Sequence, residues 1–291
     1  MHAPAGEPED HHDIAHLLVS CHDRRGVIAA VAGTVAEAGG NILDAQQHAD
    51  PGDGRFSMRL AFEEVRDAGA FEGALSSLAS ELGLRWRVRW PGPPPRIAIL
   101  CSRETHCLAD LMWRVSIGEV RAQVTRVISN HEDPGAMVRS FGFEFSYEPV
   151  SPETKPDQEA RVLSTLQADG VELVVLARYM QVLSPRFVDA MPGRIINIHH
   201  SFLPAFAGAR PYHQAYERGV KLIGATAHYV TEELDEGPIV AQQTTPVSHR
   251  DTVRDMVRKG RDLERVVLAH AVRMHLEDRV LLDGRRTIVF E

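Results

Sequence analysis

The sequence predicts an α/β protein of two domains, a ferredoxin-like α+β domain followed by a doubly wound, Rossmann-like domain. Three observations carry this prediction. The segment 91–95 (Pro-Gly-Pro-Pro-Pro) is typical of a stiff linker, because proline fixes φ and lacks a backbone donor. The residues before it follow a β-α-β-β-α-β order, which is the split βαβ pattern. The residues after it alternate between strands and helices, which is typical of an open, mostly parallel sheet.

The elements of the first domain, residues 13–90, follow from hydrophobic periodicity. An apolar face with helical spacing predicts a helix over 24–38, and the pair Gly39-Gly40 is a typical helix stop. Residues 1–12 are acidic and rich in histidine, and we expect them to form a disordered tail. The other expected elements are strands 14–21, 41–48, 56–62 and 85–90 and a helix over 68–82.

The second domain, residues 96–291, begins with a strand over 96–101 that is almost entirely apolar, as expected at the buried centre of a parallel sheet. A later strand over 195–199 carries polar residues near its carboxyl end, where ligands bind in doubly wound sheets. The other expected elements are strands 124–129, 143–147, 171–177, 221–230 and 239–247, helices 108–115, 156–168, 212–218 and 251–276, and a closing hairpin that ends at residue 290.

Composition narrows the class of protein. A chain of 291 residues with 44% hydrophobic content is large enough for real cores. A net charge of −8 and a pI near 6.0 argue against nucleic acid as a partner. No apolar run approaches the ~20 residues of a membrane span, so we expect no membrane association. The three cysteines form no CxxC pair, which favours reduced thiols in a cytoplasmic protein.

The strand over 195–199 carries the residues with the clearest chemistry. Asn197 and His199 are two apart, so they project from the same face of the strand. The amide of Asn197 is suited to polarise a carbonyl group, and the imidazole of His199 is suited to move a proton. Asp235 lies just before a predicted turn at Gly237-Pro238 and supplies a carboxylate that orients an imidazole or a water molecule. Together these three side chains predict hydrolysis or transfer of an acyl group.

Two other interpretations of these residues remain open. An Asn-x-His pair on a strand is also a common structural hydrogen-bonding pair. His200, His213 and His228 lie near the catalytic candidates in sequence and raise the question of a metal site. Their spacings match no standard ligand motif, so we expect no metal and interpret these histidines as hydrogen-bonding or packing residues.

The segments 195–206, 208–215, 224–230 and 233–239, in this order, resemble the folate-dependent formyltransferase family, and within it the formyltetrahydrofolate deformylases. The resemblance implies that Asn197, His199 and Asp235 are catalytic and that the reaction is hydrolysis of 10-formyltetrahydrofolate to formate and tetrahydrofolate. It implies a folate substrate and no separate cofactor. It also implies a set of folate-binding residues, namely Tyr179, Met180, Gln181, Val182, Leu183, Glu233 and Leu234.

One departure from the family's transferases favours water as the acceptor. Transferases that act on glycinamide ribonucleotide carry a glycine-rich turn after the first strand of this domain, where backbone N–H groups bind phosphate. Here the turn is Ser102–His106, it contains no glycine, and Glu104 would repel a phosphate. Two alternatives stay open: a formyltransferase to an amine acceptor such as glycinamide ribonucleotide, and a non-catalytic sensor of folate or amino acids.

The segments Asp23–Ile28 and Gly39–Ile42 resemble an ACT domain, a regulatory module that binds amino acids between copies of itself. The resemblance implies regulation by glycine or methionine and a homodimer or homotetramer. The residues it implies for effector binding are Asp23, Arg24, Gly26, Val27, Asn41 and Ile42. A helix cap at Asp23 and an ordinary turn before Asn41 would explain the same residues without any ligand.

Overall fold

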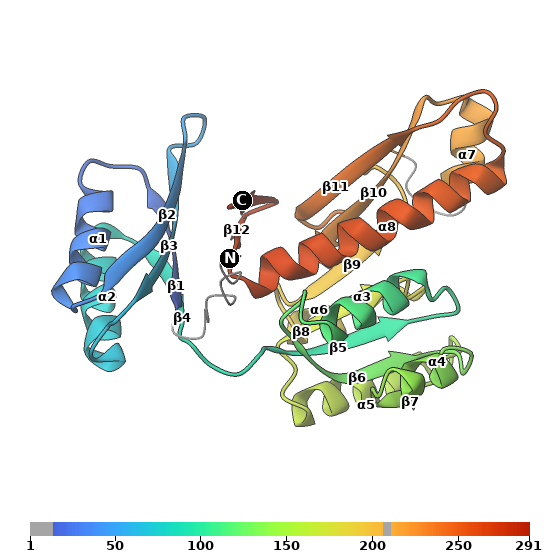
Figure 1. Cartoon of the computed structure of the whole chain (residues 1–291), viewed down its shortest axis with the longest axis horizontal. Helices are drawn as coiled ribbons and strands as arrows, with labels where there is room; N and C mark the ends of the chain where they lie inside the picture. Colours follow the sequence, from blue (N-terminus) through green and yellow to red (C-terminus); the bar gives the residue numbers. More distant parts are fainter. Residues whose placement is uncertain (1–13, 206–210) are drawn as a thin grey trace, which may run out of the picture. The chain divides into compact units, whose positions relative to one another are not determined.

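The computed structural model describes residues 14–205 and 211–291 and contains two compact units. The first unit runs to Pro93 and includes Phe290–Glu291, and the second spans Pro94–Val289. Figure 1 shows that each unit is built on its own sheet. The expected tail, residues 1–12, lies outside the described residues.

The first unit is a four-stranded antiparallel sheet with two helices on one face (Figure 1). Its elements are β1 (Ala15–His22), α1 (Val27–Glu37), β2 (Asn41–Asp50), β3 (Arg55–Glu63), α2 (Ala68–Leu82) and β4 (Arg85–Arg89). The strand order β2-β3-β1-β4 is that of the split βαβ fold. Val31 of α1 and Phe71 of α2 are fully buried in one core with Leu17 of β1 and Leu60 of β3. The predicted ferredoxin-like fold is therefore confirmed.

The second unit is a seven-stranded, mostly parallel sheet in the order β11-β10-β9-β8-β5-β6-β7. Strands β9, β8, β5, β6 and β7 are parallel, and β10 and β11 form an antiparallel edge. Its strands are β5 (Arg96–Cys101), β6 (Gln123–Ser129), β7 (Phe145–Tyr147), β8 (Leu173–Ala177), β9 (Ile195–His199), β10 (Leu222–Tyr229), β11 (Ile239–Pro246), β12 (Val280–Asp283) and β13 (Arg286–Val289). The last two form a separate hairpin, as predicted.

Helices cover both faces of this sheet, which makes it doubly wound. They are α3 (His106–Ser116), α4 (Gly135–Ser140), α5 (Lys155–Ala168), α6 (Pro185–Ala190), α7 (Pro211–Arg218) and α8 (Val253–Leu276). Side chains of α3 and α8 share a core with alternate residues of the strands, such as Val175 and Ile196. Side chains of α5 and α6 pack with the intervening residues, such as Val174 and Ile195. Each central strand is thus buried on both faces, which explains its continuous apolar sequence.

The structure differs from the sequence-based expectation at several elements. Helix α1 begins at Val27 rather than at residue 24, because Gly26 before it has φ 92 and cannot be part of a regular helix. The short helices α4 and α6 were not predicted, since six residues are too few to display a helical period. In α6 a local signal exists, because Ser184 accepts a hydrogen bond from Phe187 N–H directly before Pro185.

Across residues 14–205 and 211–291, no helix combines the length and the apolar character that crossing a bilayer requires.

Candidate active site

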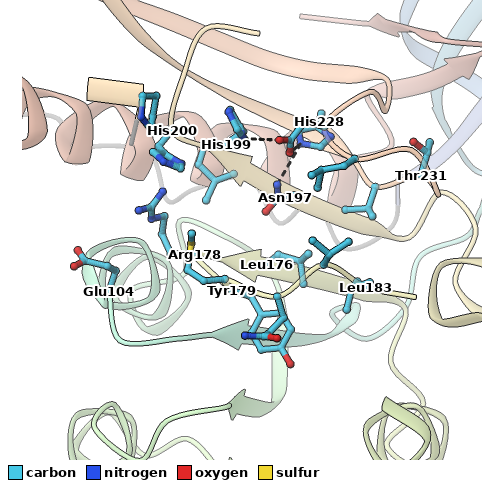
Figure 2. Close-up of a pocket in the computed structure, with 18 of the residues that line it drawn as sticks. Glu104, Leu176, Arg178, Tyr179, Leu183, Asn197, His199, His200, His228 and Thr231 are labelled. Carbon is cyan, nitrogen blue, oxygen red and sulfur yellow. Dashed lines mark hydrogen bonds and ion pairs between the residues drawn. The ribbon is translucent and has the colours of Figure 1, made fainter. Parts of the chain in front are cut away.

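Strand β9 presents Asn197 and His199 to a cavity because its alternate residues are needed in the core. Ile196 and Ile198 are buried on one face of the sheet, so Asn197 and His199 point to the other face. The antiparallel register with β10 places His228 directly opposite Asn197. Figure 2 shows the side chains of Asn197, His199 and His228 meeting there. The side-chain amide nitrogen of Asn197 lies 3.2 Å from Nε2 of His228.

Asp235 reaches this group from the loop between β10 and β11. Its backbone is left-handed, with φ 58, a conformation that is uncommon outside glycine and that often marks functional loops. The loop lies tightly against β10, because a Cβ atom on Gly237 would lie 1.7 Å from the carbonyl oxygen of Tyr229. The N–H group of Tyr229 also donates to the carbonyl of Pro238 at 2.9 Å. These contacts hold Asp235 over β9.

The contacts of His199 define its tautomer. Nδ1 of His199 lies 3.2 Å from Oδ2 of Asp235, so Nδ1 carries the proton and donates it to the carboxylate. Nε2 is buried and has no hydrogen-bond partner among the described residues. Burial works to raise the pKa of Asp235, but the hydrogen bond from His199 and the electrostatic interactions with His199 and His228 outweigh it and hold this pKa below its ordinary value. His199 therefore keeps one ring nitrogen available for proton transfer, beside an ionised Asp235.

His228 is a residue that the sequence-based site lacked. Its Nδ1 lies 2.9 Å from the carbonyl oxygen of Tyr229, which accepts only, so Nδ1 carries the proton. Burial lowers the pKa of His228 and keeps it neutral, so Nε2 accepts from the amide of Asn197. This contact fixes which end of the Asn197 side chain is the donor. The sequence contained a signal, because Thr226 and His228 alternate along β10 as Asn197 and His199 do along β9.

These side chains open onto a cavity of about 640 Å³ (Figure 2). All of the folate-binding residues expected from the sequence line it, and they come from two loops: Tyr179, Met180, Gln181, Val182 and Leu183 after β8, and Glu233 and Leu234 after β10. Met180, Val182 and Leu234 are more than half exposed, so apolar surface surrounds the opening. The buried hydroxyl of Ser102 accepts from the N–H of Met180 at 3.0 Å and holds the first loop against β5.

Residues 95–272 match the formyl transferase family, and residues 15–80 match the ACT domain. The formyltetrahydrofolate deformylase of Synechocystis sp. is 48% identical over 279 residues, covering 95% of this chain and 98% of that protein. The chain belongs to the formyltetrahydrofolate deformylase family.

Similar solved structures support the assignment of the chain to this family. The crystal structure of a formyltetrahydrofolate deformylase from Pseudomonas syringae pv. tomato superposes with a TM-score of 0.93 at 44% identity, covering 96% of this chain and 94% of that one. A glycinamide ribonucleotide transformylase from Symbiobacterium toebii superposes with a TM-score of 0.65 at 35% identity, covering 69% of this chain and 97% of that one. The deformylase family thus shares its second domain with enzymes named for formyl transfer.

The residues expected to bind an effector lie in the ACT domain, but they do not meet within one chain. Asp23, Arg24, Gly26 and Val27 follow the carboxyl end of β1, whereas Asn41 and Ile42 begin β2. Both strands pair antiparallel with β3, so β1 and β2 run in the same direction. The two groups therefore lie at opposite ends of the sheet, roughly 25 Å apart for strands of this length.

Among the described residues, one group has the proximity needed to hold a metal ion, and it does not include the histidines around Asp235. It consists of His106, Cys107 and Glu264. Nε2 of His106 hydrogen-bonds to Glu264 at 2.8 Å, and Nε of Arg178 lies 3.5 Å from the same carboxylate. Burial raises the pKa of the Cys107 thiol well above its ordinary value, which disfavours the thiolate that a metal needs. The cluster is therefore better suited to an ion pair than to a cation.

The packing of Gly237 gives a prediction about the Asp235 loop. Gly237→Ala should lower the free energy of unfolding by about 1–3 kcal/mol or more, because the new methyl group overlaps the backbone of β10. Urea denaturation measures this change. Gly33→Ala in α1 is the matched control, since nothing lies within 4 Å of its Cβ, and it should be neutral or stabilising. Wild-type stability in Gly237→Ala would contradict the packing.

The burial of His200 gives a prediction about pH. Burial, followed by the positive charge of Arg178, lowers the pKa of His200 to about 4. Between about pH 6.5 and 4 the unfolded chain binds a proton here that the folded chain does not, so stability falls as pH drops through this window. The wild type should therefore lose about 2 kcal/mol of its free energy of unfolding between pH 7 and pH 5 through this group, and His200→Gln should abolish that part of the loss. Parallel stability curves for variant and wild type from pH 5 to 7 would contradict this.

Proposed function

We propose that this chain hydrolyses 10-formyltetrahydrofolate to formate and tetrahydrofolate. The observation that carries the proposal is His199, held by Asp235 through one ring nitrogen and left without a partner at the other, next to the amide of Asn197 and the cavity. The name shared by the relatives across nearly the full chain supports the same reaction.

Asn197 is proposed to bind the formyl oxygen. One N–H of its amide donates to Nε2 of His228, and the other is free to donate to the substrate. When water attacks, negative charge develops on the formyl oxygen, and a donor that is already oriented stabilises it without reorganisation. In this mechanism His228 is a positioning residue, because it acts by holding the amide of Asn197.

His199 and Asp235 are proposed to act as one coupled unit in proton transfer. A water molecule forms a bond to the formyl carbon and gives its proton to this pair. The bond between the formyl carbon and N10 then breaks, and N10 takes up a proton as tetrahydrofolate leaves. The carboxylate of Asp235 stabilises the imidazolium that forms on His199 in between, because it already accepts from Nδ1.

The folate itself is proposed to lie against the loops that line the cavity. Apolar side chains such as Met180 and Leu234 would cover the pterin, and loop backbone groups after β8 would bind its polar edge. The reaction uses only water and the side chains described, so 10-formyltetrahydrofolate is the substrate and no separate cofactor is required. The sensor alternative is disfavoured because Asn197, His199 and Asp235 are all in contact distance of their partners.

The role of Asn197 is tested by its removal. Asn197→Ala should lower kcat by roughly 10²–10³, which corresponds to about 2.7–4 kcal/mol for one oxyanion donor. Tetrahydrofolate release is measured by absorbance, and binding of the folate substrate is measured separately by fluorescence quenching. Binding should change little, because the cavity loops are untouched. Turnover at the wild-type rate in this variant would contradict the assignment.

We further propose that the ACT domain binds a small amino acid, with glycine and methionine as the candidates. Asp23–Val27 and Asn41–Ile42 lie at opposite ends of one sheet, so a single site that contains both groups needs a second copy of the chain. This geometry supports a homodimer or homotetramer with the effector between subunits.

The shared effector site predicts a link between binding and assembly. Light scattering and turnover are measured with and without glycine or methionine, in wild type, Asp23→Ala and Asn41→Ala. We expect an oligomer in the wild type and loss of the amino-acid response in both variants. A monomer that binds either amino acid would contradict a site shared between copies.

A further inference from the structure

The cavity has one end made of charged side chains. In Figure 2, Glu104 and Arg178 lie on one side of Asn197 and His199, and Leu183 and Thr231 lie on the other. The second side belongs to the loops proposed to hold folate. A second substrate that accepts the formyl group would therefore have to approach the reacting carbon from the charged side.

A chain of polar contacts crosses this end and joins the β5–α3 loop to helix α8. Nη2 of Arg261 lies 2.6 Å from Oε2 of Glu104. The same oxygen lies 3.7 Å from Nδ1 of His106, whose Nε2 lies 2.8 Å from Glu264. The carboxylate of Glu104 is thus paired, and its role at the turn after β5 is to form contacts across the cavity end as well as to carry negative charge.

Glu264 is the buried centre of this network, with only 1% of its side chain exposed. The hydroxyl of Tyr212 donates to it at 2.7 Å, and Nε of Arg178 lies 3.5 Å away. Burial works to raise the pKa of Glu264, but the hydrogen bond from His106 and the charge of Arg178 outweigh it and lower this pKa. Tyr212 is fixed in turn, because its hydroxyl packs where a Cβ on Gly260 would lie, 1.9 Å away.

Arg178 brings a positive charge to the same end. It follows β8 directly with φ 62, a conformation that is uncommon outside glycine. Its side chain is 13% exposed, and its Nε and Nη1 atoms are buried without a hydrogen-bond partner in the described part of the chain. A guanidinium held in this way fills volume beside the cavity. Moving it away would be costly, because the buried carboxylate of Glu264 would lose a positively charged partner.

We propose that the network of Arg261, Glu104, His106, Glu264 and Arg178 closes the acceptor end of the cavity, so that water reaches the formyl carbon and amines do not. This inference rests on the proposed hydrolysis and names its specificity determinant. The fold alone does not exclude an acceptor, because the transformylase from Symbiobacterium toebii has the same domain. Side chains must therefore decide. An amine attacks in its neutral form and is larger than water, so to reach the formyl carbon from this end it would have to displace the packed side chain of Arg178.

The test opens the network without leaving a buried charge unpaired. Arg178→Gly combined with Glu264→Gln removes both partners, and glycine suits the left-handed backbone at residue 178. The variant is supplied with 10-formyltetrahydrofolate and with hydroxylamine or glycinamide. In the competing reaction the amine nitrogen bonds to the formyl carbon and loses a proton, the bond to N10 breaks, and N10 gains a proton. Mass spectrometry measures the N-formyl product and the formate formed per tetrahydrofolate released.

We expect the ratio of N-formyl product to formate to rise by at least about tenfold over the wild type in the double variant. Arg178→Lys, which keeps the positive charge, should stay near the wild-type ratio. Arg258→Ala is the matched control, because Arg258 is a largely exposed arginine on the same helix as Arg261 and its ion pair among the described residues is with Asp255 at the surface. It should leave the ratio unchanged.

An unchanged ratio in a double variant that still releases tetrahydrofolate would overturn the inference. Arg261→Ala opens the same network at a side chain that is 47% exposed, so this variant serves as the test if the double variant is inactive. An unchanged ratio of N-formyl product to formate in Arg261→Ala would also overturn the inference. The proposed function fails in a different way, which is the absence of formate release by the wild type when no amine is present.

Discussion

The antiparallel pairing of β10 with β9 is the constraint on which the site depends. The core needs Ile196 and Ile198, so Asn197 and His199 must face the other side of the sheet. The register then places His228 opposite Asn197, and the end of β10 leads into the loop that returns Asp235 to His199. A slip of one residue would turn the polar side chains into the core and the isoleucines toward the cavity, so the core and the site fix the same register.

Burial controls the protonation states around the cavity. It keeps His200 and His228 neutral. The hydrogen bond from His199 lowers the pKa of Asp235, and the hydrogen bond from His106 and the charge of Arg178 lower the pKa of Glu264, so both carboxylates stay ionised. The two carboxylates differ in what surrounds them. The carboxylate of Asp235 faces His199 and is proposed to support proton movement, whereas the carboxylate of Glu264 is enclosed by His106, Tyr212 and Arg178. In the proposed mechanism, proton transfer and closure of the cavity thus depend on separate groups of residues.

Much of the fold could be predicted from the sequence, because long elements display their period. Strands β5 and β9 and helix α2 have the predicted bounds. The six-residue helices α4 and α6 were missed because their signals are only caps and turns. At the site, Asn197 and His199 were predicted from alternation, and Asp235 from its turn and the family resemblance. The hydrogen-bonding role expected for His228 is confirmed, but its place beside Asn197 was not predicted, because that contact comes from a neighbour in another strand.

The sequence by itself determined which side chains share a face of a strand, where the linker and turns lie, and which family the chain resembles, because these features reside in short segments. The tertiary structure decided which faces meet. It separated the two groups of expected effector residues along one sheet, and it joined Glu104 to Arg261, which are 157 positions apart in sequence. Strand order, register and long-range ion pairs depend on how the elements pack around a common core, and no local pattern specifies that packing.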